Sequence, residues 1–287
     1  MNGILIMDKP QGFTSHDVVA KLRGICKTRR IGHTGTLDPM ATGVLPVFIG
    51  RATRACEFAT GDDKTYLAHI RLGVTTDTQD ITGETLSTSP VTCTEEDVRA
   101  VCASFVGEIS QIPPMYSAIK IGGKKLYELA RDGIEIERAP RNVTIHSIEV
   151  SPISNEEYAL TVHCSKGTYI RTLCADIGEK LSCGACLSSL RRTQAGAYTI
   201  EQVHTFEQIG ENPEAFLLPV DSLFLQHPAI KISGKSEQKC RNGAPVPCSE
   251  VQDGTLYRVY NENGEFLMLA RGENRTLRTV KSFFEVS

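Results

Sequence analysis

The chain has 287 residues, a formal net charge of −3 at neutral pH and 40% hydrophobic residues. This length predicts about two domains with a sizeable core, and no stretch approaches the ~20 apolar residues of a membrane span. The slightly acidic balance argues against a protein that coats nucleic acid indiscriminately, although a local cluster of cations would still permit RNA binding. The N-terminal segment lacks a basic region, so we expect a cytoplasmic protein without a signal peptide.

Residue patterns along the chain predict an α+β protein with many strands. Alternating apolar and polar residues at 66–72 are typical of a half-buried strand, and Thr94 with Asp97 resembles a capping box that opens a helix. The expected strands lie at 4–7, 44–49, 66–72, 143–150 and 158–163, and the expected helices at 15–23, 53–58, 94–105 and 169–181.

The stretch 32–45 is the most informative part of the sequence, with three glycines, three threonines, one His and one Asp. Its glycines allow the backbone to approach a ligand closely or to adopt a positive φ, and Pro39 predicts an extended turn at Asp38. These glycines are Gly32, Gly35 and Gly43. Between residues 21 and 54, seven cations accompany Asp38 and no other acid does. The pattern indicates a reactive carboxylate beside a polyanion, and the alternative is a solvated turn capped by its own side chain.

The ten cysteines are expected to be reduced thiols that act as small buried hydrophobic residues. Cys183 and Cys186 form the only CxxC pair, whereas a structural zinc site of this type would need a second pair at similar spacing. The sequence therefore predicts no metal.

The last 60 or so residues have a different composition, which predicts a boundary near 226–228. Asp-Gly and Asn-Gly pairs, which are hairpin signals, separate three short strand patterns in this part of the chain. The patterns lie at 229–232, 256–260 and 266–270. We expect one domain over residues 1–226 and a small β-barrel over 227–287.

The stretch 32–45 resembles the catalytic motif of the tRNA pseudouridine synthase B family, in which the Asp of a GHxGTLDPxAxGVL-type sequence is the nucleophile. The similarity extends from residues 3–10 to residues 190–194. It implies an α+β fold, with a mixed-sheet pseudouridine synthase catalytic domain followed by a PUA-like RNA-binding β-barrel. It also implies isomerisation of uridine to pseudouridine at position 55, in the T-loop of tRNA. No cofactor is expected for this reaction, because nothing is oxidised and no group leaves the site.

The resemblance also implies roles for individual residues. Asp38 corresponds to the nucleophile, and a carboxylate is ionised at neutral pH without a neighbouring base. Arg171 corresponds to the arginine that pairs with it, and its planar guanidinium suits such a pair better than a lysine would. Tyr66 corresponds to the aromatic residue that stacks on the target uracil, and its phenol is a candidate for the base that takes the C5 proton. Further substrate-binding residues are His33, which fills the space of the flipped base, and Lys64, Tyr169 and Leu190.

Residues 111–133 carry two prolines, a Gly-Gly pair and four cations, and they correspond to an RNA-contacting insertion of the family. Its last part, 124–132, is expected to form a helix with Gly133 as the residue after its C-cap. The cations expected to contact the RNA backbone are Lys120, Lys124, Lys125 and Arg131. The alternative is a surface hairpin without a role.

Three other functions fit the sequence less well. A non-catalytic tRNA-binding or RNA-folding module would not need Asp38, Tyr66 and Arg171 together. A Walker-type phosphate loop would need a lysine that 32–45 lacks, and a glycosidase would need two cooperating carboxylates. We therefore expect a monomeric enzyme that flips its target base out of the T-arm stem-loop of tRNA. The sequence leaves open whether the reaction proceeds by attack at C1′, by attack at C6 or by elimination.

Overall fold

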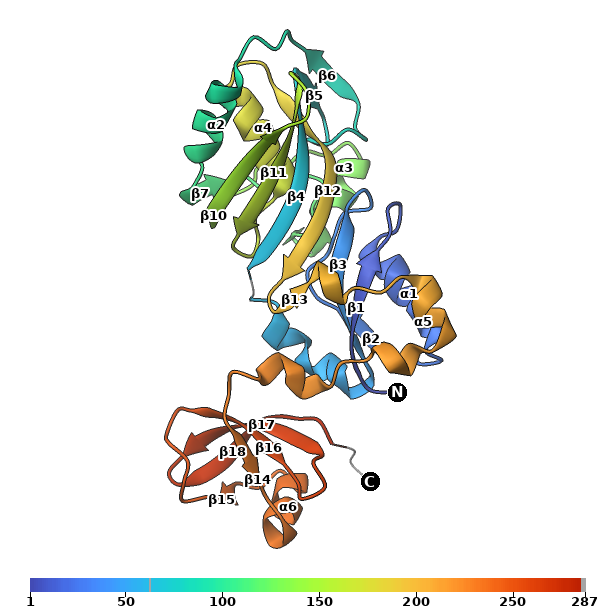
Figure 1. Ribbon diagram of the computed structural model, residues 1–287, viewed down its shortest axis with the longest axis vertical. Coiled ribbons are helices and arrows are strands. Elements are labelled where there is room, and N and C mark those ends of the chain that lie inside the picture. The colour runs from blue at the N-terminus through green and yellow to red at the C-terminus, as the bar shows by residue number, and fades with distance from the viewer. Residues whose placement is uncertain (62, 285–287) are drawn as a thin grey trace.

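The structure, a computed structural model, describes residues 1–61 and 63–284. A mixed sheet of nine strands forms its centre (Figure 1). These strands are β1 (Gly3–Lys9), β2 (Ile31–His33), β3 (Thr42–Ile49), β4 (Lys64–Leu72), β7 (Gly107–Gln111), β10 (Arg141–Pro152), β11 (Glu157–Cys164), β12 (Ala185–Ala195) and β13 (Tyr198–Thr199). Seven of them run side by side in the order β1-β3-β12-β4-β11-β10-β7, while β2 pairs with β3 and β13 with β12.

Helices cover parts of this sheet and bury its apolar residues in separate clusters. The helices that accompany this sheet are α1 (Ser15–Ile25), α2 (Glu95–Ala103), α4 (Ile170–Lys180), α5 (Phe206–Glu211) and the 3-10 helices η1 (Gly50–Ala59), η2 (Ile200–Gln202), η3 (Pro213–Phe216) and η4 (Val220–Phe224). Helices α2 and α4 pack on one face of β4, β10, β11 and β12, and α1 with α5 packs on β1 and β3. No helix in the described ranges is both long and apolar enough to cross a membrane.

Strand β4 shows how the residue pattern sets the orientation of the site. Its side chains alternate between buried and half-exposed, as the sequence predicted. Tyr66, Ala68 and Ile70 therefore point into the cluster under α4, whereas the residues between them face the open side of the sheet.

The insertion consists of a short hairpin and a helix. Strands β8 (Lys120–Ile121) and β9 (Lys124–Lys125) pair with each other and lead into α3 (Leu126–Arg131). The helix begins later than predicted, because the two lysines at its expected start are bonded to β8 instead. Gly133 follows the helix with a φ of 70°, which confirms its predicted position. A second hairpin, β5 (Val74–Thr76) with β6 (Thr85–Thr88), follows β4.

The C-terminal part is a five-stranded sheet at one end of the molecule, in red and orange in Figure 1. Its elements are β14 (Ala229–Lys231), α6 (Gly234–Arg241), β15 (Val246–Pro247), β16 (Leu256–Tyr260), β17 (Phe266–Glu273) and β18 (Thr276–Ser282). It has a core of its own, but Phe266 and Phe283 also pack on Phe224 of η4. The two parts of the chain therefore share an apolar interface.

Several elements differ from the sequence predictions, and three of the differences have a clear physical reason. Residues 53–58 belong to a 3-10 helix rather than an α-helix, and its buried Ala52 and Ala55 have the three-residue spacing of that helix. Strand β12 was not predicted, because two β-bulges interrupt its alternation. Helix α6 was not predicted either, because Cys240 is its only buried residue. The cysteines agree with expectation, since all ten are free thiols and seven are buried.

Candidate active site

Asp38 lies on an irregular turn between β2 and β3, as Pro39 predicted. The N–H of Leu37 donates to the Oγ of Ser15, the first residue of α1, at 2.9 Å. The carbonyl of Pro39 accepts from the N–H of Gly12 at 2.8 Å. The carbonyl of Asp38 accepts from the N–H of Ala41 at 3.1 Å. These bonds fix the turn on both sides of Asp38, so its carboxylate is held by the backbone before any substrate binds.

Gly43, the second residue of β3, follows this turn at a position that requires glycine. Its φ is 97°, and a Cβ at this position would lie 2.3 Å from the carbonyl oxygen of Arg192 on β12. Any other residue would separate β3 from β12, two neighbouring strands of the sheet. Gly35 also has a positive φ, whereas Gly32 does not.

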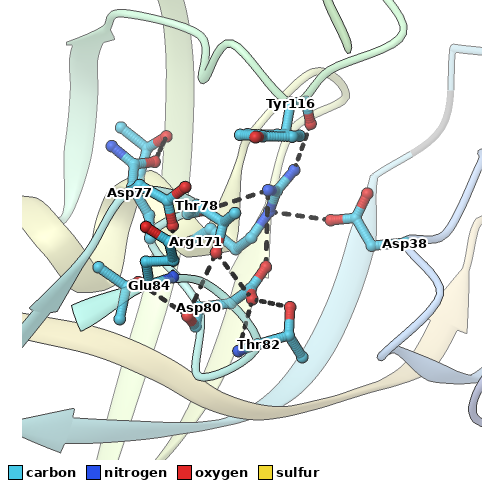
Figure 2. Close-up of polar contacts among 11 residues, drawn as sticks. Asp38, Asp77, Thr78, Asp80, Thr82, Glu84, Tyr116 and Arg171 are labelled. Carbon is cyan, nitrogen blue, oxygen red and sulfur yellow. Dashed lines mark hydrogen bonds and ion pairs between the residues drawn. The ribbon is translucent and has the colours of Figure 1, made fainter. Parts of the chain in front are cut away.

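Arg171, in the first turn of α4, is the centre of the site (Figure 2). Its Nε lies 2.9 Å from Oδ2 of Asp38, and the side chain of Arg171 is only 5% exposed. The guanidinium also donates to the main-chain carbonyls of Thr78, at 3.1 Å, and Tyr116, at 2.6 Å. The predicted pair of Asp38 and Arg171 therefore exists in space, although 133 positions separate the two residues.

Asp80 is a second carboxylate in this cluster that the sequence did not reveal. Its Oδ2 lies 3.6 Å from a terminal nitrogen of Arg171, and its side chain is buried. Its Oδ1 accepts from the N–H of Thr82 and from the hydroxyl of Thr78, both at 3.0 Å. Asp80 thus contacts a different nitrogen of the guanidinium from Asp38 (Figure 2), which suits holding Arg171 in place.

Electrostatics at Asp38 reflect two opposing effects. Burial of the Asp38 carboxyl and the charge of Asp80 raise the pKa of Asp38, whereas Arg171 and Lys9 lower it. The net effect is a raised pKa. The side chain keeps 39% of its exposure, so one side of the carboxylate remains open to a substrate.

Lys9 is a buried cation next to the same turn that the sequence also did not reveal. Its Nζ donates to the carbonyls of Phe13, at 2.6 Å, and of Pro39, at 3.3 Å. Burial lowers the pKa of Lys9 to about 8, while the negative charge of Asp38 opposes that shift. Its ammonium therefore supports the turn that carries the carboxylate.

Tyr66 lies in the same apolar cluster as Leu37, Met40 and Leu190 and is 8% exposed. Burial raises the pKa of its phenol, and a hydrogen bond with Arg192 opposes this. Arg192 is itself buried and donates to the carbonyls of Val44 and Gly35, each at 2.7 Å. A phenol with a raised pKa stays protonated at neutral pH, which suits a stacking platform.

Two other predicted substrate-binding residues also lie next to these side chains. The backbone N–H of Tyr169, the residue just before α4, donates to Oε1 of Gln111 at 3.0 Å. Burial raises the pKa of the Tyr169 phenol, and the nearby hydroxyl of Ser117 opposes this. Leu190 on β12 pairs with Ala68 of β4 and is buried. The insertion thus contributes Ser117 and the carbonyl of Tyr116 to the surroundings of the site.

The other two predicted substrate-binding residues, His33 and Lys64, lie on strands β2 and β4. His33 belongs to strand β2 rather than to a loop, and its ring meets that of His16 edge to face at 5.3 Å. Burial lowers the pKa of His33 to about 4, so this ring is neutral at physiological pH. Lys64 begins β4, two positions before Tyr66, and lines a small cavity with Gly35 and Tyr198.

The cations of the insertion lie outside this buried centre. Lys120, Lys124 and Arg131 are exposed. Lys125 and Arg131 lie against the ring of Tyr127, with their charged groups 5.2 and 5.4 Å from its centroid. These side chains are therefore available to a partner in solution.

Two solved complexes contain a chain with a similar fold. A chain of the "Crystal Structure of a Cbf5-Nop10-Gar1 Complex" superposes with a TM-score of 0.73 and 26% identity, covering 98% of this chain and 85% of that one. A chain of the archaeal box H/ACA sRNP Nop10-Cbf5 complex superposes with a TM-score of 0.70 and 25% identity, covering 98% of this chain and 86% of that one. The α+β fold expected from the sequence is confirmed: a mixed sheet is followed by a small β-domain, whose five-stranded sheet stands where the small β-barrel was expected.

Two family models match consecutive parts of the chain. The model of the TruB family pseudouridylate synthase N-terminal domain matches residues 23–170, and that of the tRNA pseudouridylate synthase B C-terminal domain matches residues 171–224. This fold and site therefore define a pseudouridylate synthase, which is an isomerase.

Curated relatives narrow the class further. The tRNA pseudouridine synthase B of Clostridium kluyveri is 42% identical over 99% of this chain and 100% of its own length. That of Alkaliphilus oremlandii is 52% identical over 83% of this chain and 81% of its own length. The chain belongs to the TruB family.

Proposed function

We propose that this protein isomerises uridine to pseudouridine at position 55, in the T-loop of tRNA, with Asp38 as the nucleophile. The contact of 2.9 Å between Asp38 and Arg171 carries this proposal, because it holds an accessible carboxylate against a buried cation. The relatives named tRNA pseudouridine synthase B support tRNA as the substrate. A binding module without catalysis would have no use for a charged pair built into its interior at a desolvation cost.

The reaction needs an ionised carboxylate, and the charge of Arg171 favours that form of Asp38. During isomerisation the N1–C1′ bond breaks, the uracil turns, and a C5–C1′ bond forms, while a proton leaves C5 and the freed N1 gains one. Attack at C1′, attack at C6 and elimination all begin from the same charged form of Asp38. The guanidinium favours that form by opposing the rise in pKa that burial causes.

Tyr66 and Leu190 are proposed to hold the uracil while it turns. Both belong to the apolar cluster that also contains residues of the Asp38 turn. A flat ring and an aliphatic side chain offer a surface without strong hydrogen bonds, on which a free base can rotate. His33, which is neutral at physiological pH, is proposed to stack in the space of the flipped base, a step that costs a few kcal/mol.

RNA binding is proposed to use surfaces outside the reaction centre. The exposed cations of residues 111–133 are suited to phosphate contacts. We assign residues 1–226 to a catalytic domain and 227–287 to a PUA-like RNA-binding domain, joined by the apolar interface around Phe224. The protein is proposed to act as a monomer in the cytoplasm.

The proposed reaction is tested by incubating the protein with an unmodified tRNA transcript and mapping pseudouridine at single-nucleotide resolution. We expect one new pseudouridine, at position 55. Binding of the transcript without any pseudouridine would instead identify a non-catalytic module, and modification at several unrelated positions would refute the proposed specificity.

A further inference from the structure

A second group of polar side chains lies on the sheet, outside the reaction centre. Asp63 precedes β4, while His146 belongs to β10 and His163 to β11. One ligand atom from each residue lies within 4.8 Å of the other two. Nε2 of His146 is 3.0 Å from Oδ2 of Asp63, and the two imidazole rings are 4.7 Å apart between centroids.

The sheet brings these residues together through a β-bulge. Strand β10 pairs with β11, but the register shifts between Ile145 and Ser147. Ser147 pairs with His163, so His146 is an extra, unpaired residue next to that pair. A bulge redirects the side chain that it carries. Cys164, the next residue of β11, points into the core and is fully buried, which leaves His163 on the open face of the sheet.

We propose that Asp63, His146 and His163 bind a zinc ion. Imidazole nitrogens and a carboxylate oxygen are preferred zinc ligands, at about 2.0–2.2 Å from the metal. Ligand atoms at such distances in a tetrahedral site lie about 3.3 Å from one another, which is close to the 3.0 Å between His146 and Asp63. The third ligand needs only a small side-chain rotation, since no pair of ligand atoms exceeds 4.8 Å. The fourth position is open to water.

The pair of His69 and Glu157 on the same face shows what distinguishes this group. Its closest atoms are 4.0 Å apart, and a single imidazole faces a single carboxylate. One imidazole and one carboxylate make an ordinary surface ion pair, whereas the proposed site adds a second imidazole, that of His163, beside its pair of His146 and Asp63. The pair of His69 and Glu157 is therefore a matched control for the metal site.

The proposed zinc would join three neighbouring segments of the sheet: the start of β4, which carries Tyr66, and strands β10 and β11. Asp63 lies three positions before Tyr66, and β11 is the neighbour of β4. A metal at this point would fix the start of β4 against β10 and β11, so its expected effect is on stability. The sequence predicted no metal, because only the fold brings these three residues together.

The test uses the untagged full-length protein and zinc ions, with calorimetric titration and thermal unfolding as readouts. We expect one zinc per chain, and at a free concentration about 100 times the dissociation constant the unfolding equilibrium should shift about 100-fold toward the folded state. His146→Ala and His163→Ala should each remove this binding, while His69→Ala should retain it. Without metal, all of these variants should form pseudouridine at the same rate as the wild-type protein.

Cobalt(II) spectroscopy on the same proteins separates this site from the ten thiols. Cobalt bound by Asp63 and the two histidines should give tetrahedral ligand-field bands without thiolate charge-transfer absorption. Two results would overturn the proposal: equal zinc binding by wild type and the His146→Ala/His163→Ala double variant, or a thiolate-type cobalt spectrum. Absence of any zinc binding stronger than about 1 mM would do the same.

Discussion

The reaction centre and the insertion use charge in opposite ways. Around Asp38 the charged groups are few, and the buried Arg171 contacts two carboxylates and two main-chain carbonyls. In residues 111–133 three of the four cations are exposed, and two of the four lie against an aromatic ring. The first arrangement changes the reactivity of one carboxylate, whereas the second offers exchangeable contacts to a polyanion.

This difference predicts which measurement each substitution will affect. A change in the buried centre should alter turnover with little effect on affinity, since one carboxylate provides little of the binding energy for a large RNA. A change in the insertion should alter affinity and its salt dependence. Results that mix the two effects would show that the regions are not separate in function.

Asp38→Asn should have the largest effect, because it removes the proposed nucleophile while nearly preserving its shape. We expect turnover below about one-hundredth of wild type, with tRNA affinity within a few fold. Asp132→Asn, an exposed carboxylate at the end of α3, is the control and should turn over normally. Substantial turnover by Asp38→Asn would remove Asp38 from the role of nucleophile.

Tyr66 substitutions should separate stacking from proton transfer. Tyr66→Ala loses both the ring and the phenol, so the rate of isomerisation should fall strongly. If the phenol takes the C5 proton, Tyr66→Phe should lose about 10²–10⁴-fold in rate with substrate still bound. Near-normal turnover of Tyr66→Phe would show that the ring is only a platform, as the protonated state of the buried phenol favours.

Arg171 should control the pH at which the enzyme loses activity. The carboxylate form of Asp38 is the reactive one, so the rate falls as the pH drops through the pKa of Asp38. Arg171 lowers that pKa. Arg171→Met should therefore raise it and move the acid limb of the single-turnover rate to higher pH, with partial recovery in alkaline buffer. An acid limb at the wild-type position would mean that Arg171 does not set the ionisation of Asp38.

Lys124→Ala together with Lys125→Ala should have the smallest effect on chemistry. The slope of log K against log salt for tRNA binding should become shallower by roughly one to two units, as expected when up to two phosphate contacts are lost. The control is Arg99→Ala, because Arg99 is also an exposed cation but pairs with Glu95 on helix α2. An unchanged salt slope in the double variant would support a surface hairpin without contacts to phosphate.

The sequence predicted the parts of the site that short motifs describe. Asp38 and Tyr66 lie as expected, since Pro39 defines a turn and the alternation of β4 directs Tyr66 inward. Asp80 and Lys9 were not predicted, because each owes its role to contacts with distant segments rather than to a local pattern. The bulged strand β12 was missed for a related reason: its irregular side-chain pattern is stabilised by its neighbours β3 and β4.

Single-turnover rates at saturating tRNA, measured side by side for Asp38→Asn and for the Lys124→Ala/Lys125→Ala variant, test the separation of chemistry from binding most directly. We predict a rate below about one-hundredth of wild type for the first variant and a rate near wild type for the second. Similar losses in both variants, or a larger loss in the lysine variant, would contradict the account.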